Sequence, residues 1–515
     1  MRELVRNFYW GLTGERQSML VAAGRVEWRR SAQAQDACIP ANVEIDMAGR
    51  FLLPGFVDAH CHILPAGLAS RSLDLEMCTT REQILDALRD RDAALPAEEW
   101  LHAVHYDQNR LPGGGHLHRN DLDSISAGRP ILVRHVSGHG GVANSAALSA
   151  AKVEDDIANS LGGKHARDAS GHLTGLLSAS AWDRVEAAAP KANVEQMVEA
   201  IMAAGDLMAR RGITCAADMM TGYADLADEL TAYRLAAERG CAVRLRLYVL
   251  WSRVLGPRPL APERLDALLR GMDGATCRVA GLKVFADGAL SSRTAAIYGA
   301  YENSEAEHSE TWSGNLVYKP ERLAEMLCKA DDAGYQVATH TIGDYATDCV
   351  LDALDRLEQP ARHRLEHAML LDDRQVDRLA KLGVPCSVQP EFLLRLKDAY
   401  VRSLGVDRTA KLSRTRSLLR AGVGVGFSSD KPVVEGDPWD GVAAATDRPD
   451  GFDPSENLSI TEALEAYTCG AADLCGDKGL IGRLNAGEWA DYQVYDADPR
   501  SARAPRPIEV RLGRP

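Results

Sequence analysis

The 515-residue chain has little that would direct it to nucleic acid or to a membrane. It carries 59 Lys and Arg against 73 Asp and Glu, a formal net charge of −14. Nucleic acids and anionic membranes are recognised through basic patches, which such a balance disfavours. No apolar run reaches 18 residues, and charges interrupt the first 20 residues where a secretion signal would be apolar. We predict a cytoplasmic protein with no nucleic-acid or membrane partner.

Cysteine pairs and nucleotide-binding loops are also missing. The 11 cysteines include no C-x-x-C pair, and their odd number does not fit a disulfide framework. We expect free thiols in a reducing compartment. No G-x-G-x-x-G or P-loop motif follows an apolar run, which disfavours a nucleotide-binding sheet. The remaining composition, 46% hydrophobic and 26% charged, is that of a globular protein able to bury a core.

The chain does contain a regular alternation of apolar, β-rich runs and helical segments. Alternation of this kind predicts an α/β fold with a parallel sheet, either a (β/α)₈ TIM-like barrel or a doubly wound sheet. The missing nucleotide loops favour the barrel. The eight predicted strands are 52–58, 213–218, 243–250, 279–285, 335–339, 362–366, 384–388 and 423–427.

Three regions depart from this alternation. Residues 1–54 and 482–515 hold short alternating pieces punctuated by Gly and Pro, and we predict that they pair into one small β domain. Residues 55–481 would form the barrel. About 150 residues separate the first two predicted strands, far more than one helix needs. We therefore predict a long insertion after the first barrel strand, at about 64–190.

Two histidines end the first predicted barrel strand, in Val-Asp-Ala-His-Cys-His at 57–62. Side chains alternate faces along a strand, so His60 and His62 share one face while Cys61 packs on the other. A single histidine at a strand end is more often structural than a ligand. A pair on one face, however, can reach the same cation.

Further polar residues lie in or just after other predicted strands. Lys283 is in the fourth, His340 and His367 end the fifth and sixth, and Asp430 follows the eighth. Taken singly, Lys283 would be an ion-pair partner and Asp430 a helix cap. The carboxyl ends of barrel strands converge on one mouth, where active sites form. Together these residues predict a metal centre at that mouth.

These segments are similar to the amidohydrolase superfamily, and most closely resemble the amidohydrolase-3 branch that includes N-substituted formamide deformylases. The likeness extends over nearly the whole chain, and the ordered set of motifs is far more specific than H-x-H alone. The matching segments are Leu-Pro-Gly-Phe-Val-Asp-Ala-His-Cys-His at 53–62, then 138–148, 283–295, 340–344, 364–368, 429–433 and 482–491.

The resemblance implies a metal-dependent hydrolase whose termini form a small β-sandwich. It implies two divalent ions, most simply zinc, since His and carboxylate ligands suit that metal best. The hydrolase would cleave a C–N amide-type bond, of an N-formyl, N-acyl or related carbonyl compound, by attack of a metal-bound hydroxide. Asp430 would act as general base and then acid. The implied ligands are His60, His62 and Asp430 for one ion, His340 and His367 for the other, and N6-carboxylated Lys283 as the bridge.

Substrate contacts are harder to predict. The candidates are His139, Asp287, Arg293 and Gln389, and a structural role is at least as good a reading for His139. The branch often has a histidine just beyond Gln-Pro, where this chain has Gln389-Pro-Glu-Phe, and a glutamate near 178, where it has serine. These departures bear on the substrate, which we expect to be a small molecule.

Alternatives remain open from the sequence. A mononuclear deaminase of the same superfamily would not need Lys283, so that residue favours the binuclear site. A dipeptide, carbamate or lactam hydrolase would use the same residues. An inactive scaffold would be expected to lack a ligand, and all six are present. A homo-oligomer is compatible with the sequence.

Overall fold

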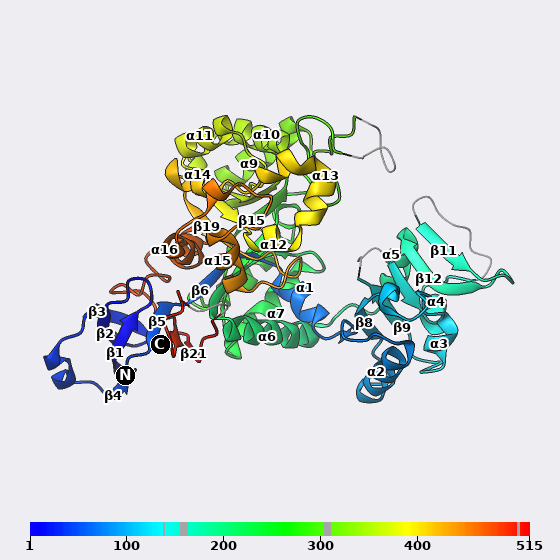
Figure 1. Cartoon of the computed structure of the whole chain (residues 1–515), viewed down its shortest axis with the longest axis horizontal. Coiled ribbons are helices and arrows are strands. Elements are labelled where there is room, and N and C mark those ends of the chain that lie inside the picture. Colours follow the sequence, from blue (N-terminus) through cyan, green and yellow to red (C-terminus); the bar gives the residue numbers. More distant parts are fainter. Residues whose placement is uncertain (137–139, 155–162, 303–310, 502–504, 515) are drawn as a thin grey trace. The chain divides into compact units, whose positions relative to one another are not determined.

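The computed structural model of the chain describes residues 1–515 except 137–139, 155–162, 303–310, 502–504 and 515 (Figure 1). It comprises two compact units, one made of Met1–Ala66 with Ile201–Pro515 and the other of Gly67–Ala200. Within the described ranges, no helix is long and apolar enough to cross a membrane.

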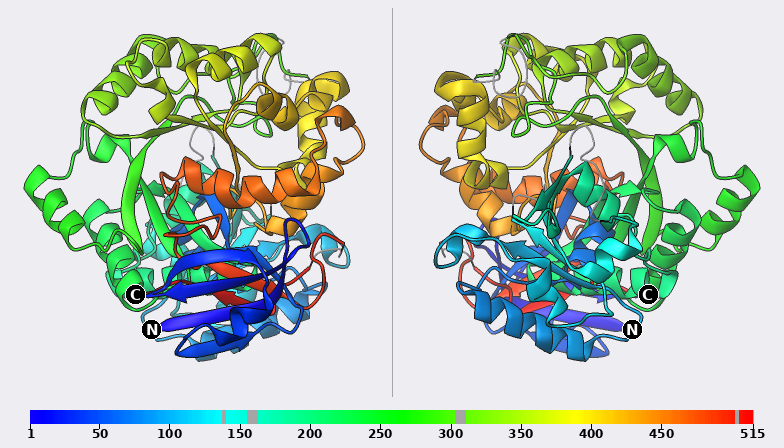
Figure 2. Two further views of the ribbon diagram at one scale, coloured as in Figure 1. Left: turned by 90° about the vertical axis from the view of Figure 1, so that its left-hand side faces the viewer. Right: turned by 90° about the vertical axis from the view of Figure 1, so that its right-hand side faces the viewer.

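The first unit is built around a sheet of eight parallel strands (Figures 1 and 2). Most of these strands are almost entirely buried, as expected for a parallel sheet covered by helices on its outer face. In spatial order the strands are β6 (Phe56–Cys61), β13 (Ile213–Thr221), β14 (Arg244–Leu250), β15 (Cys277–Phe285), β16 (Val337–Thr341), β17 (Arg364–His367), β18 (Cys386–Val388) and β19 (Val425–Phe427).

The two edge strands of this sheet are joined just beyond their carboxyl ends. The Asp430 N–H donates to the His60 carbonyl at 2.7 Å, and the His62 N–H donates to the Lys431 carbonyl at 2.8 Å. Asp58, in β6, also accepts hydrogen bonds from the backbone N–H and the hydroxyl of Ser429, at 3.0 and 2.6 Å. The sheet is therefore a nearly closed, TIM-like barrel.

Helices between the strands carry ordinary start and stop signals. At α11, Asp372 accepts from the Gln375 N–H in a capping box, and Gly383 ends the helix at φ 66°. The helices of this unit are α7 (Leu226–Glu238), α8 (Pro262–Arg270), α9 (Pro320–Asp332), α10 (Asp344–Leu354), α11 (Asp373–Leu382), α12 (Glu391–Arg395), α13 (Lys397–Ala410), α14 (Thr415–Arg420), α15 (Pro438–Thr446), α16 (Ile460–Glu465) and α17 (Ala471–Leu474).

The first predicted strand, 52–58, is wrong in one respect, because the structure divides it at Gly55. Residues Phe51–Pro54 form β5, which pairs with strands from the two ends of the chain, and the barrel strand β6 begins at Phe56. Gly55 at this division packs directly against Thr214. A Cβ on Gly55 would lie 2.0 Å from the Thr214 hydroxyl oxygen, so a larger residue would clash with that side chain.

Both ends of the chain contribute strands to a second sheet of the first unit. Its seven strands follow the order β21-β20-β5-β1-β2-β3, with β4 paired to β1. The strands hydrogen-bond as one sheet, so the predicted β-sandwich is not confirmed. The strands besides β5 are β1 (Arg2–Trp10), β2 (Arg16–Ala22), β3 (Arg25–Ser31), β4 (Val43–Asp46), β20 (Tyr492–Tyr495) and β21 (Glu509–Arg511).

The second unit, Gly67–Ala200, has its own sheet and its own hydrophobic core. Its strands follow the order β11-β12-β10-β9-β8-β7, and Leu88, Tyr106 and Trp182 are among its buried side chains. Its elements are β7 (Leu73–Asp74), α2 (Arg81–Ala94), β8 (Leu101–Tyr106), α3 (Arg119–Asp123), β9 (Ile131–His135), β10 (Gly140–Ala143), α4 (Ser145–Ala150), β11 (Gly163–Arg167), β12 (Leu173–Ala179) and α5 (Ser180–Glu186), while α1 (Ile63–Ala69) and α6 (Val194–Arg210) cross its boundaries.

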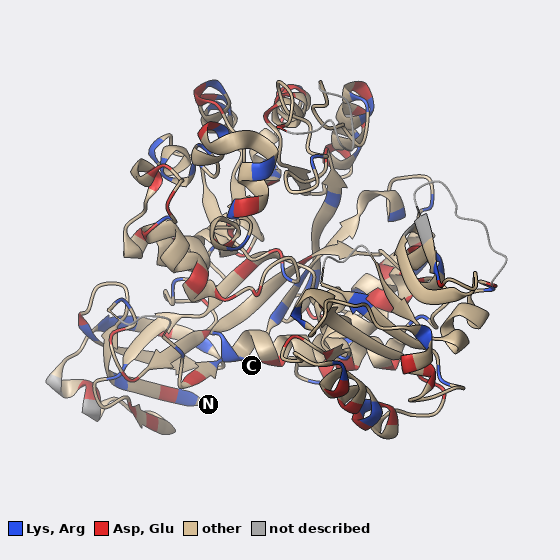
Figure 3. Ribbon diagram, turned by 45° about the vertical axis from the view of Figure 1, so that its right-hand side comes forward, with Lys and Arg blue, Asp and Glu red and all other residues tan. Residues whose placement is uncertain are grey.

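Acidic and basic residues are interspersed along the outer helices of the barrel (Figure 3). On α10 and α11, for example, Arg374 pairs with Asp348 at 2.6 Å and Arg378 pairs with Asp352 at 2.8 Å. Arg374 and Asp352 are exposed, whereas Asp348 is buried. Solvent-exposed pairs contribute little to stability one by one. The charges that matter for function are the buried ones at the ends of the barrel strands.

Candidate metal centre

Three potential metal ligands meet where β6 ends beside the segment after β19. Asp430 Oδ1 lies 2.9 Å from His62 Nε2 and 3.4 Å from His60 Nε2. The ligand atoms of all three residues lie within 4.8 Å of one another. Burial alone would raise the pKa of Asp430, but the His60 and His62 rings hold that pKa well below its usual range. The site thus offers an ionised carboxylate and two imidazoles to one cation.

Two more histidines lie beside this group. The ring centroids of His340 and His367 are 4.5 Å apart, and those of His60 and His367 are 4.8 Å apart. Burial lowers the pKa of His340 to about 3, assisted by the charge of Lys283. Burial also lowers the pKa of His367 well below its ordinary value. Both imidazoles are therefore uncharged at neutral pH, the form in which histidine binds a metal.

Lys283, in β15, is the last of the six predicted ligands. It lies two residues before the end of that strand, rather than at the end itself, and only 1% of its surface is exposed. Burial lowers the pKa of its ammonium group to about 8. Its Nζ finds no hydrogen-bond acceptor among the described residues, and neither does His62 Nδ1 find a partner there. Buried polar groups without partners are costly and rare.

This donor set fits divalent metal. It combines four imidazoles, one carboxylate and a buried amine, which are nitrogen and oxygen donors of the kind that zinc and its neighbours bind. A bound cation would also give His62 Nδ1 a partner. Outside this set, the described residues contain one further group with ligand-like spacing, the exposed cluster of Asp74, Glu76 and His105.

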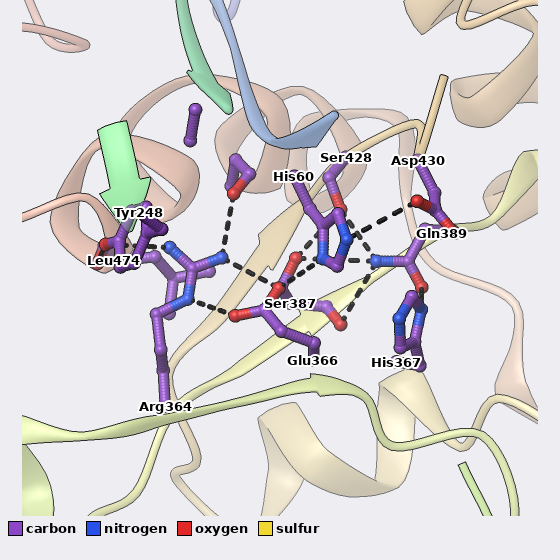
Figure 4. Close-up of polar contacts among 12 residues, drawn as sticks. His60, Tyr248, Arg364, Glu366, His367, Ser387, Gln389, Ser428, Asp430 and Leu474 are labelled. Carbon is purple, nitrogen blue, oxygen red and sulfur yellow. Dashed lines mark hydrogen bonds and ion pairs between the residues drawn. The ribbon is translucent and has the colours of Figure 1, made fainter. Parts of the chain in front are cut away.

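The sequence reasoning missed Glu366, which lies directly behind His60 (Figure 4). Its Oε2 is 2.6 Å from His60 Nδ1, and the side chain is completely buried. Arg364 holds the carboxylate from the other side, with Nε 2.6 Å from Oε1 and Nη2 3.0 Å from Oε2. Burial would raise the pKa of Glu366, but Arg364 and then His60 lower it strongly. The contact leaves His60 Nε2 facing Asp430.

A signal for Glu366 was present in the sequence. Arg364 and Glu366 are two positions apart in a strand that was predicted to be buried, so they share a face. Two opposite charges on one buried face require each other or a third partner.

Gln389 holds the other buried ring, that of His367. Its Oε1 accepts from His367 Nδ1 at 2.8 Å, and its Nε2 donates to Ser428 Oγ at 2.9 Å (Figure 4). Ser428 Oγ is in turn 2.8 Å from Ser387 Oγ. Because Nδ1 carries the proton in this arrangement, His367 Nε2 is left as the ligand atom. The predicted contact of Gln389 with substrate stays a prediction.

The other predicted substrate contacts differ in their surroundings. Asp287 is buried, accepts from the backbone N–H groups of Ala296, Ile342 and Gly343, and lies 3.6 Å from His340 Nε2. Burial raises its pKa to about 7. Arg293 is half-buried and adopts φ 56°. His139 lies outside the described residues. A role in substrate binding stays a prediction for all three.

Comparison with known proteins identifies the family behind this geometry. A family model described as "Amidohydrolase family" matches residues 43–512, which is nearly the whole chain. The chain belongs to the amidohydrolase family. As a member, it is a hydrolase, and a metal-dependent one, in agreement with the ligand set that the barrel brings together.

Individual relatives agree with this assignment. The Bacillus subtilis protein YtcJ is 31% identical over 471 residues, covering 89% of this chain and 86% of its own. The N-substituted formamide deformylase of Arthrobacter pascens is 27% identical over 512 residues, covering 94% and 90% of the two chains. An uncharacterised metal-dependent hydrolase from Pyrococcus furiosus superposes with a TM-score of 0.80 at 26% identity, over 97% of this chain and 100% of that one.

Proposed function

We propose that this amidohydrolase cleaves the C–N bond of a small amide-type carbonyl compound, with N-formyl and N-acyl amides as the first classes to test. The observation that carries the proposal is the convergence of His60, His62 and Asp430 beside the unpartnered Lys283. The similarity to a protein named N-substituted formamide deformylase supports the choice of substrate class.

In this proposal the centre holds two divalent ions, zinc in the simplest case. His60, His62 and Asp430 hold one ion, and His340 and His367 hold the other. Lys283, carboxylated on Nζ, would contribute a ligand to both ions, since a carbamate is an anionic oxygen ligand whereas an ammonium group would repel cations. When bound, the ions acidify a water molecule and polarise the substrate carbonyl.

Asp430 moves the proton in the proposed reaction. Its carboxylate is ionised at neutral pH, because the neighbouring imidazoles lower its pKa. It can therefore accept a proton from the attacking water and then deliver that proton to the departing nitrogen. His60 and His62 face the carboxylate and keep it oriented toward the reacting atoms. Glu366 and Gln389 fix the rings of His60 and His367 from behind.

A substrate screen tests the proposal. Zinc-loaded protein is offered N-formyl amides, N-acyl amides, carbamates, lactams and dipeptides, with release of amine and acid followed together. Turnover of at least one compound, lost in Asp430→Asn, is the expected result. Release of ammonia from an amino-substituted ring, with no cleavage of any amide-type compound, would contradict the proposal.

A further inference from the structure

The rings of His60, His367 and His340 are hydrogen-bonded to groups that differ in charge. His60 Nδ1 contacts the Glu366 carboxylate at 2.6 Å. His367 Nδ1 contacts the Gln389 amide oxygen at 2.8 Å, and His340 Nε2 contacts the Gly288 carbonyl at 2.9 Å. The partner of the His60 ring is thus an anionic carboxylate, whereas the partners of the His367 and His340 rings are neutral.

We propose that Glu366 and Gln389 are positioning residues that make the two metal positions unequal, so that the His60 position retains metal more tightly than the His367 position. The proposal rests on the two-ion arrangement of the proposed function. A hydrogen bond from a ligating imidazole to a carboxylate raises the basicity of the ligand more than a bond to a neutral amide does. Asp430 adds a second negative charge on the His60 side.

The surroundings of Glu366 keep its charge in place. Arg364 binds both carboxylate oxygens, and its Nη2 also donates to the Ala59 carbonyl at 2.8 Å. The ion pair therefore fixes both the ionised state and the orientation of the carboxylate, while Oε2 remains directed at His60. Both side chains are completely buried, so water does not screen the contact.

Within the described residues, no carboxylate is within hydrogen-bond distance of the His367 ring, although the charge of Asp430 acts on His340 and His367 as well as on the His60 side. Asp287 lies 3.6 Å from His340 Nε2 and accepts three backbone N–H groups. Behind Gln389 are the hydroxyl groups of Ser428 and Ser387. In the proposed function Lys283 would contribute a ligand to both positions, so it would not distinguish them.

Metal retention measures the inequality without a substrate. Zinc per chain is determined by mass spectrometry after equilibration in chelator buffers of graded free zinc concentration. For the wild type we expect two separate steps. His340→Ala should lose the weaker step and His62→Ala the tighter one, which assigns each step to a position.

Two substitutions then exchange the supporting groups. Glu366→Gln should weaken the tighter step about 10- to 100-fold, the usual cost of losing such a contact. Gln389→Glu should tighten the weaker step about tenfold by the same effect. Glu229→Gln is the matched control, because Glu229 is also buried and accepts from the backbone N–H groups of Gly222 and Ala224, neither of which is a proposed ligand. It should move neither step.

The outcomes separate this inference from the proposed function. If the wild type binds no zinc at any concentration, the proposed function fails and the inference fails with it. If it binds two ions in one step, or if folded Glu366→Gln keeps the tighter step unchanged, only the inference is overturned. Should Glu366→Gln not fold, Gln389→Glu decides, because an unchanged gap between the two steps contradicts the inference.

Discussion

Buried polar groups at the two ends of the barrel strands differ in whether they have hydrogen-bond partners. Near the amino-terminal end of β14, Arg244 binds both oxygens of Asp491 at 2.7 and 2.9 Å, and Arg246 binds Asp477 at 2.6 Å. Toward the carboxyl ends, the Lys283 Nζ and His62 Nδ1 atoms are also buried, but they have no hydrogen-bond partner among the described residues.

The difference separates structural charges from functional ones. A buried ion pair with complete hydrogen bonds holds segments together, and removal of one partner is costly. A buried group without a partner makes the metal-free protein less stable and persists because something else binds there. Substitutions at the amino-terminal end should therefore change stability, and substitutions at the carboxyl end should change activity and metal binding.

The largest expected effect is on catalysis. Asp430→Asn keeps the shape of the side chain but removes its proton-accepting charge. We expect kcat/KM to fall about 10²- to 10⁴-fold, the usual contribution of a general base. Steady-state kinetics with a substrate from the screen measure the loss, and circular dichroism should show that the variant is folded. Retention of wild-type kcat/KM would remove Asp430 from the mechanism.

The opposite end should show a large effect on stability alone. Asp491→Asn leaves the Arg244 guanidinium buried without its counter-charge. We expect the free energy of unfolding to fall by about 3–5 kcal/mol, as measured by urea denaturation, while kcat/KM per folded molecule is unchanged. If Asp491→Asn were as stable as the wild type but inactive, this charge would have a functional role and not a structural one.

Lys283 should give the metal-free protein a distinctive pH dependence. Its folded-state pKa of about 8 lies below the unfolded value of 10.5, so between these values the unfolded chain binds more protons. Stability therefore rises with pH in this window, by up to about 3 kcal/mol.

The control for this effect is Lys283→Met, which is similar in volume and carries no charge. Urea denaturation of both metal-free proteins at pH 7.5 and at higher pH, on the order of 10, gives the difference between their pH dependences. We expect the variant to be the more stable at the lower pH and the gap to close at the higher. A constant gap would mean that the buried amine does not titrate in this range.

The smallest effect belongs to the hydroxyl chain behind His367. Ser428→Ala removes the acceptor of the Gln389 Nε2 hydrogen bond. We expect a loss of about 1 kcal/mol in the free energy of unfolding, and a several-fold loss of kcat/KM through the less well-held ring. Thermal melts and kinetics of the same preparation measure both. An unchanged kcat/KM would show that Gln389 is held adequately without this contact.

Most of the barrel could be predicted from the sequence, because long alternating segments leave a strong pattern. Each of the eight predicted strands corresponds to a strand in the sheet, apart from the division at Gly55. The strands that pair with β5 and with β6 are distant in sequence from Gly55, so no local pattern reveals the division.

The sequence predicted the residues that the structure brings together in the candidate site, but not their supporting contacts, and their role as metal ligands stays a prediction. The H-x-H pair, His340, His367 and Asp430 lie at or near strand ends, where position alone suggests a role, while Lys283 lies inside β15. Glu366 and Gln389 act through contacts with residues from other strands, 306 and 22 positions away, and such pairings arise only in the folded chain. The sharing of one face by Arg364 and Glu366 was the only local clue.

Anomalous diffraction from crystals of the zinc-loaded protein tests the central claim most directly. The account predicts one zinc peak bounded by His60, His62 and Asp430, and a second bounded by His340 and His367, with extra density on Lys283 Nζ between them. Peaks at another place, such as the exposed cluster of Asp74, Glu76 and His105, with none at the barrel mouth, would contradict it.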